Sequence, residues 1–163
     1  MDPRSLQGMT GPVGKAGLTG ISGAATTYST AAAGFSYAVR GKAATKAQVS
    51  GGATPTTDAY TGAAITLTAN KARSVVWMVN AAGTVRVAAG PIVDLDSGGA
   101  YMDAPVFPNI DENIDCPFAY TLHKAGSTTV GTWTFGSSNW NATGLTHTVV
   151  DVIFGLPDRP QTS

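Results

Sequence analysis

Six glycines recur at every third position near the start of the chain, and this spacing restricts the fold more than any other feature. The glycines are Gly8, Gly11, Gly14, Gly17, Gly20 and Gly23. A collagen triple helix requires glycine at every third residue, because only a residue without a side chain fits at the axis where three polyproline-II strands meet. The spacing predicts a collagen-like arm and therefore a trimer.

The repeat is short and contains a single proline, Pro12, so a second interpretation stays open. Glycine-rich segments also behave as flexible linkers. The repeat is followed by residues 24–34, which are rich in Ala, Thr and Ser and show no helical stripe of apolar residues. We therefore interpret residues 1–34 as a collagen-like arm and neck, and residues 35–163 as a β-rich body.

Charge and cysteine content restrict the class of partner. Ten Lys and Arg residues balance ten Asp and Glu residues in a chain of 163, so no overall field attracts nucleic acid or an anionic membrane. The single cysteine cannot form an intrachain disulfide, and we find neither an export signal nor an apolar run long enough to span a membrane. We expect synthesis in a reducing cytoplasm.

The two halves of the chain carry opposite charge. Residues 1–90 hold eight basic and two acidic residues, and residues 91–163 hold two basic and eight acidic ones. In one interpretation the halves interleave in the fold and neutralise each other. In the other, the particle has a basic end and an acidic end, which suits docking on a surface of opposite sign.

From Phe35 onward, short apolar or Thr-rich runs are interrupted about every ten residues by Gly, Pro, Asn or Asp. This pattern is typical of antiparallel strands joined by turns, and it predicts an all-β fold, either an antiparallel β-sandwich or a small barrel. An ordered but irregular excursion is expected over residues 90–117, which hold several prolines and most of the acids. The expected strands cover residues 35–40, 64–68, 74–80, 84–88, 118–123, 130–135 and 145–154.

Two hairpins are expected among these strands. The first pairs residues 74–80 with 84–88 across a turn that contains Asn and Gly, and it places Arg86 on the outward side. The second pairs residues 118–123 with 130–135.

The chain offers little for catalysis. A hydrolase needs a nucleophile, a base and an orienting group in one place, and we find no such combination. We interpret His123 and His147 as surface or packing residues, and Cys116 as a small buried hydrophobic residue, because nothing nearby in the sequence would lower its pKa. The chain is therefore predicted not to be an enzyme.

No metal site or cofactor is predicted. Asp94-Leu95-Asp96 resembles the start of a calcium loop, but the twelfth position is Pro105 where a bidentate Glu is required. We interpret the second acidic cluster, Asp111, Glu112 and Asp115, as a solvated loop. The glycine pairs precede no helix and do not form a nucleotide-binding loop.

The three tryptophans differ in their surroundings. Trp77 and Trp133 lie in expected strands and are predicted to be core residues. Trp140 lies in the polar stretch Ser138-Asn139-Trp140-Asn141 and is predicted to be an exposed contact.

Several stretches of the body resemble small virion structural proteins of tailed bacteriophages. The resemblance lies in the style and order of short motifs over most of the chain after the arm. These motifs are Phe35-Ser-Tyr-Ala-Val-Arg-Gly-Lys42, Thr54-Pro-Thr-Thr-Asp58, Gly83-Thr-Val-Arg-Val-Ala88, Cys116-Pro-Phe-Ala-Tyr120, Trp133-Thr-Phe-Gly136, Asn139-Trp-Asn-Ala-Thr143 and Leu156-Pro-Asp-Arg-Pro160.

A collagen-like repeat joined to a small β domain is also similar to trimeric head-decoration proteins and fibres of phages. The resemblance implies a homotrimer on the capsid surface that bridges subunits of the major capsid protein. A head or tail fibre that binds a host glycan or receptor is the alternative. A collagen-like bacterial surface protein is a third possibility, which the lack of a visible export signal disfavours.

Overall fold

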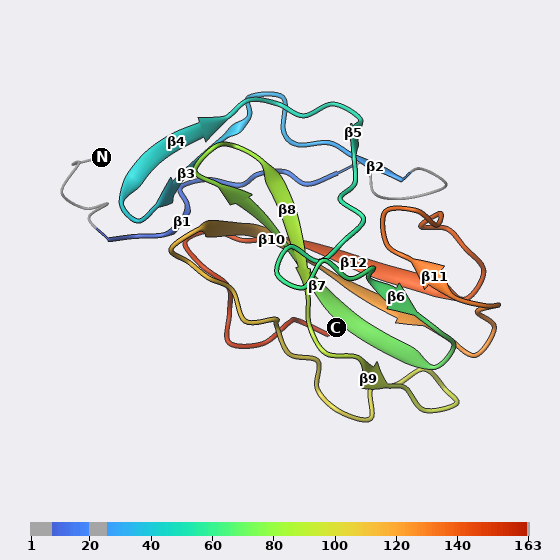
Figure 1. Ribbon diagram of the computed structural model, residues 1–163. Coiled ribbons are helices and arrows are strands. Elements are labelled where there is room, and N and C mark those ends of the chain that lie inside the picture. Colours follow the sequence, from blue (N-terminus) through green and yellow to red (C-terminus); the bar gives the residue numbers. More distant parts are fainter. Residues whose placement is uncertain (1–7, 20–25, 163) are drawn as a thin grey trace.

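The computed structural model describes residues 8–19 and 26–162. Within these residues the regular secondary structure consists of β-strands, which turns and loops connect (Figure 1). The strands form four antiparallel sheets, none of which closes into a barrel. The described residues contain no helix, and so none that is long and apolar enough to cross a membrane. The prediction of an all-β antiparallel fold is confirmed. Of the two predicted architectures, the sheets resemble a sandwich and do not form a barrel.

The largest sheet has five strands. Its main path runs in the order β12 (Leu145–Asp151), β10 (Asp115–Ala125), β7 (Lys71–Asn80) and β8 (Val85–Ala89). The short β9 (Val93–Asp94) pairs with the start of β7. Because β7 and β10 are central and covered on both faces, most of their residues are buried, whereas an exposed sheet would bury only every second one.

Three smaller sheets lie around it (Figure 1). The three-stranded sheet has the order β1 (Gly11–Pro12), β3 (Phe35–Val39) and β4 (Lys42–Lys46). Arg40 and Gly41 join β3 to β4 with positive φ angles of 52° and 76°, which is the geometry of a tight type I′ hairpin turn. The remaining pairs are β2 (Thr27–Tyr28) with β5 (Gly52–Ala53), and β6 (Thr66–Leu67) with β11 (Trp133–Thr134).

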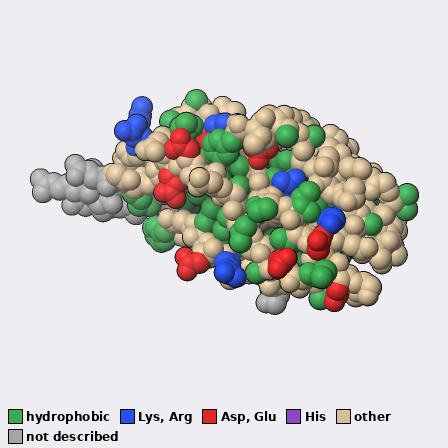
Figure 2. Space-filling view, turned by 60° about the horizontal axis from the view of Figure 1, so that its bottom comes forward, with side chains coloured by type: hydrophobic (Ala, Val, Ile, Leu, Met, Phe, Trp, Pro, Cys, Tyr) green, Lys and Arg blue, Asp and Glu red, His purple; other side chains and the backbone are tan. Residues whose placement is uncertain are grey.

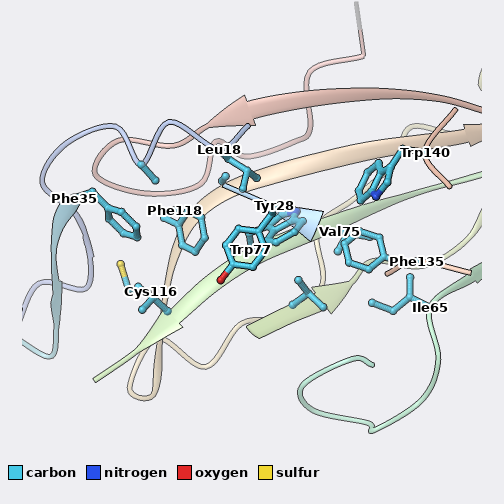
Figure 3. Close-up of a cluster of buried hydrophobic side chains, with 14 of the residues drawn as sticks. Leu18, Tyr28, Phe35, Ile65, Val75, Trp77, Cys116, Phe118, Phe135 and Trp140 are labelled. Carbon is cyan, nitrogen blue, oxygen red and sulfur yellow. The ribbon is translucent and has the colours of Figure 1, made fainter. Parts of the chain in front are cut away.

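The main core lies between the five-stranded sheet and the smaller sheets, and its central side chains are aromatic (Figure 3). The ring of Trp77 lies 5.2 Å from that of Tyr28 and 5.6 Å from that of Phe135. Leu18 and Tyr28 come from the first 34 residues, yet they are buried in the same cluster as the body. In the single chain, this part of the predicted arm and neck therefore packs into the core.

The first expected hairpin is confirmed, and the second is wrong. Strands β7 and β8 pair with Val79 opposite Val85. Strand β10 pairs instead with β12, with Ala125 opposite Leu145, while β11 pairs with β6. The reason is that residues 126–144 form a long connection that contains only the short β11. Its aromatic side chains fill one end of the core, so it does not lie beside β10 as a strand.

The irregular excursion is confirmed for residues 95–114, which contain turns and one isolated bridge but no strand. The last strand ends earlier than expected, at Asp151. Beyond it the chain turns away from the sheet, and Phe154 adopts a positive φ of 69°.

Candidate interaction surface

The outer face of the five-stranded sheet is covered by loops and not by strands. Residues 90–114 and 152–162 pass over it, and Phe107, Ile110 and Leu156 pack against its buried side chains. We call the outer surface of these two segments the loop-covered face. Figure 2 is turned toward this side and shows hydrophobic side chains interspersed with acidic and basic ones.

Most large hydrophobic side chains that the described residues leave exposed belong to these two segments. Eight such side chains are exposed, and Val130 is the only one with no link to the loop-covered face. Tyr60 touches the face because its hydroxyl accepts a hydrogen bond from the amide of Asp111 (3.1 Å). The other six are Ile92, Met102, Val106, Ile114, Ile153 and Phe154. Apolar exposure gathered in this way is typical of an interaction site.

The same segments are acidic. Arg159 is their only basic residue, against six exposed carboxylates, of which Asp94 pairs with Lys71 of β7. A partner of this face would have to offer Lys or Arg around an apolar centre. The six acids are Asp94, Asp96, Asp103, Asp111, Glu112 and Asp158.

A buried ion pair anchors one end of the first loop segment. One guanidinium nitrogen of Arg86 donates to both carboxylate oxygens of Asp115 at 3.1 and 2.9 Å, and the other donates to the carbonyl of Ala59 at 2.9 Å. Asp115 is completely buried. Arg86 lies on the outer face of the sheet, away from Val85 and Val87, as expected, whereas the expectation that Asp115 is solvated is wrong. The reason is that the Arg86 side chain reaches from β8 across β7 to the start of β10, where its guanidinium pairs with the carboxylate of Asp115.

Tyr60 extends this network. Its hydroxyl donates to a carboxylate oxygen of Asp115 at 2.9 Å while it accepts the amide hydrogen of Asp111. Burial, together with the neighbouring Asp115 carboxylate, raises the pKa of Tyr60 to about 12. The phenol therefore stays protonated and remains a hydrogen-bond donor near neutral pH.

Asp58 secures the loop that carries Tyr60. Its carboxylate accepts hydrogen bonds from the amides of Ala89, Tyr60 and Thr61 at 2.8 to 2.9 Å. Burial alone would raise the pKa of Asp58, but these backbone hydrogen bonds outweigh burial and lower it. The two buried carboxylates of this region therefore act as structural anchors, each with its own set of donors.

The predicted exposed contact at Trp140 is wrong, because its side chain is completely buried. Its ring packs edge-on against Phe135 at 5.2 Å and lies 4.8 Å from the ring of His123. Its polar neighbours in the sequence remain at the surface while the indole fills the core. Trp77 and Trp133 are buried, as predicted.

His123 is a packing residue and is completely buried, with its ring stacked 5.0 Å from that of Trp133. Its Nε2 is 2.8 Å from the hydroxyl of Thr121, whereas its Nδ1 has no partner among the described residues. Burial and the nearby His147 hold the pKa of His123 well below its usual value. The imidazole is therefore neutral inside the folded protein.

Cys116 is buried in the main core, as predicted. Burial, with the neighbouring acids Glu112 and Asp115, raises the pKa of this thiol to about 12, so it is not a thiolate at neutral pH. The described residues bring no three His, Cys, Asp or Glu side chains into a group that could hold a metal ion. Within the calcium-like stretch, Asp96 accepts the amides of Gly98 and Ala100 from its own turn.

The collagen-like repeat lies partly inside the described residues. Gly11 forms part of β1 beside β3, while Gly8 and Gly17 have φ angles of 75° and 62°, opposite in sign to the polyproline-II value. Gly20 and Gly23 lie outside the described residues. The triple helix stays a prediction, since only one chain is present.

Two of these glycines have a structural reason within the single chain. A Cβ on Gly11 would lie 2.8 Å from the carbonyl oxygen of Phe154, and a Cβ on Gly17 would lie 2.9 Å from the Cβ of Ala31. Gly14 has neither a close neighbour nor a left-handed backbone. Packing within the single chain therefore does not require a glycine at position 14.

The comparisons with known proteins add no relative. The chain matches no model of a protein family, no curated protein and no solved structure.

Proposed function

We propose that this chain is a non-enzymatic structural protein of a tailed-bacteriophage virion, a trimeric decoration protein that bridges and stabilises subunits of the major capsid protein. Such a protein acts by adding contact area where the shell's own contacts are sparse. Three copies present three identical patches to a three-fold position, and each weak contact strengthens the others. The protein would be made in the host cytoplasm and would end on the capsid surface.

The observation that carries this proposal is the loop-covered face. Its two segments carry exposed apolar side chains such as Ile92, Met102 and Val106 together with six exposed carboxylates. The loops that bear these side chains are held to the sheet by the Arg86–Asp115 pair and by the hydroxyl of Ser74, which donates to the carbonyl of Val106 at 2.7 Å. Anchored loops lose little freedom on binding, which favours a lasting attachment.

The fibre alternative loses its main residue. A glycan-binding fibre was expected to use an exposed aromatic ring, and Trp140 was the candidate. Because its side chain is completely buried, it has no free face on which a sugar could stack.

The test is binding to shells assembled from the major capsid protein of the same phage. We expect the purified protein to sediment with the shells and to raise their melting temperature. Met102→Glu should weaken this binding, because Met102 is 67% exposed on the loop-covered face. Val130→Glu is the matched control, since Val130 is 91% exposed elsewhere, and it should bind normally. Failure of the wild-type protein to sediment with shells would overturn the proposal.

A further inference from the structure

Phe154 differs from the other exposed large hydrophobic residues in having a strained backbone. Its φ of 69° lies in the left-handed region, which a bulky side chain rarely adopts, and its ring is 62% exposed. Strain of this kind is kept only where surrounding contacts impose it, and it often marks a functional position.

Those contacts come from the collagen-like segment. The amide of Phe154 donates to the carbonyl of Pro12 at 3.1 Å, and the carbonyl oxygen of Phe154 lies where a Cβ on Gly11 would clash. Strand β1 thus fixes the turn that carries the exposed ring. The glycine repeat, from which a trimer is predicted, is therefore hydrogen-bonded to the backbone of the residue that carries this exposed ring.

A surface pocket of about 240 Å³ is lined by residues on both sides of Phe154 in the chain. Its lining is largely apolar and includes Tyr120, Val150, Ile153 and Leu156. Both neighbours of Phe154 line the pocket, but Phe154 itself does not. The ring of Phe154 therefore does not occupy the pocket of its own chain.

The charges around this site favour a second copy of the same chain. Asp158 and Arg159 follow the pocket's Leu156 and Pro157, and both are exposed. Neither forms an ion pair within residues 8–19 and 26–162. Because the site carries one exposed charge of each sign beside an apolar projection and an apolar recess, another copy of the chain offers both the opposite charges and the matching apolar parts.

We infer that Phe154 of one copy inserts into the Tyr120–Leu156 pocket of the next, and that this contact joins the copies of the trimer. The inference rests on the trimer of the proposed function and names its contact. In a trimer each copy gives its Phe154 ring to one neighbour and receives the ring of the other neighbour in its pocket, so the contact is head-to-tail and three such contacts close a ring about a three-fold axis. A reciprocal exchange between two copies would give a dimer, and a wild-type dimer would contradict the inference.

The experiment measures the mass of the full chain by analytical ultracentrifugation over a wide range of concentration. The wild-type protein should be a trimer. Phe154→Asn should weaken association by about 10- to 100-fold in the dissociation constant, as expected for loss of an aromatic anchor. Asparagine tolerates the left-handed backbone, so the melting temperature of this variant as a monomer should not fall.

Two further variants locate the contact. Gly155→Trp should weaken association similarly, because Gly155 lines the pocket and has open space around its Cβ position, so a large side chain there can occupy the recess. Val130→Asn, at an exposed site away from the pocket, should leave the mass unchanged.

The outcomes separate this inference from the proposed function. If the wild-type protein is a trimer and Phe154→Asn assembles equally well, the contact is wrong while the decoration role stands. A wild-type monomer at all concentrations also overturns the contact. A trimer that is weakened by Phe154→Asn but does not bind shells would support the contact and overturn the decoration role.

Discussion

The two faces of the five-stranded sheet are buried by different means. On the inner face, Trp77 packs against Tyr28 of β2 and Phe135 of the 126–144 connection, and the short strands β3, β6 and β11 contribute further core side chains. On the outer face, Met78 and Tyr120 are just as buried, but the covering residues belong to loops. Loops can therefore cover one face of a sheet when buried polar contacts hold them in place. Here those contacts are the hydrogen bonds of Asp58 and the Arg86–Asp115 ion pair.

The largest effect should come from the inner face. Trp77→Ala removes a completely buried ring from the centre of the core, and we expect the free energy of unfolding to fall by about 3 to 5 kcal/mol. Leu156→Ala, on the half-buried loop side, should cost less, about 1 to 2 kcal/mol, because loops can settle into the space. Urea denaturation measures both values. Equal losses would contradict the difference between the two faces.

The anchor of the outer face should give the next effect. Arg86→Met leaves the carboxylate of Asp115 buried without its ion-pair partner, and we expect a loss of about 3 kcal/mol. Lys71→Met is the control, because the Lys71–Asp94 pair is exposed and an exposed pair contributes less than about 1 kcal/mol. If urea denaturation gives the same small loss for both variants, the polar anchor is not what holds the loops.

The sequence predicted the inner face better than the outer one. The run Ser74–Asn80 is apolar, β-branched and followed by a turn containing Asn and Gly, and these local properties were enough to place β7 and β8. The partner of β10 could not be predicted in this way. Pairing with β12 spans the 19 residues 126–144, which contain only the short β11, and nothing local indicates that β11 pairs with the distant β6 or that Trp140 fills the core.

The candidate surface was only partly predictable. The acidic, proline-rich excursion was expected from composition, but the roles of Arg86 and Asp115 were missed. In an alternating strand, an arginine between valines suggests a solvent-facing residue, and its reach to a carboxylate 29 positions away depends on the tertiary fold. Both ion pairs join a base of the first half to an acid of the second. At these two positions the oppositely charged halves interleave.

Stability should also depend on pH through His123. Burial, His147 and Arg73 lower the pKa of His123 in the folded state, whereas the unfolded chain takes up a proton below about pH 6.5. The unfolded state then binds more protons, so the free energy of unfolding should fall as pH drops from 7 towards 5. The other groups that face His123 are Thr121, Trp133, Phe135 and Trp140, none of which titrates in this range.

Urea denaturation at a series of pH values checks this dependence. His123→Gln should flatten the curve between pH 7 and 5, even if it lowers stability overall. Asp58, whose pKa is also lowered, affects stability only below about pH 4, so the two contributions fall in separate ranges. An unchanged slope in His123→Gln would show that another group is responsible.

The smallest effect concerns two glycines three residues apart in the repeat. Gly11→Ala should destabilise the single chain by about 1 to 3 kcal/mol, because its new methyl group would meet the backbone of Phe154. The methyl group of Gly14→Ala would have no neighbour within 4 Å. We therefore expect this variant to raise the free energy of unfolding of the isolated chain by about 0.5 to 1 kcal/mol. Thermal unfolding of monomer measures both.

Gly14 therefore separates what one chain needs from what an assembly needs. If three chains approach closely at the repeat, Gly14→Val should lower the fraction of trimer although the folded chain has room for the side chain. Sedimentation at fixed concentration measures that fraction, with Lys15→Val at the exposed neighbouring position as the control. If Gly14→Val forms trimer as well as the control, no close approach exists at this position. The glycine spacing would then reflect only packing within the chain, as at Gly11 and Gly17, and the collagen-like interpretation would be wrong.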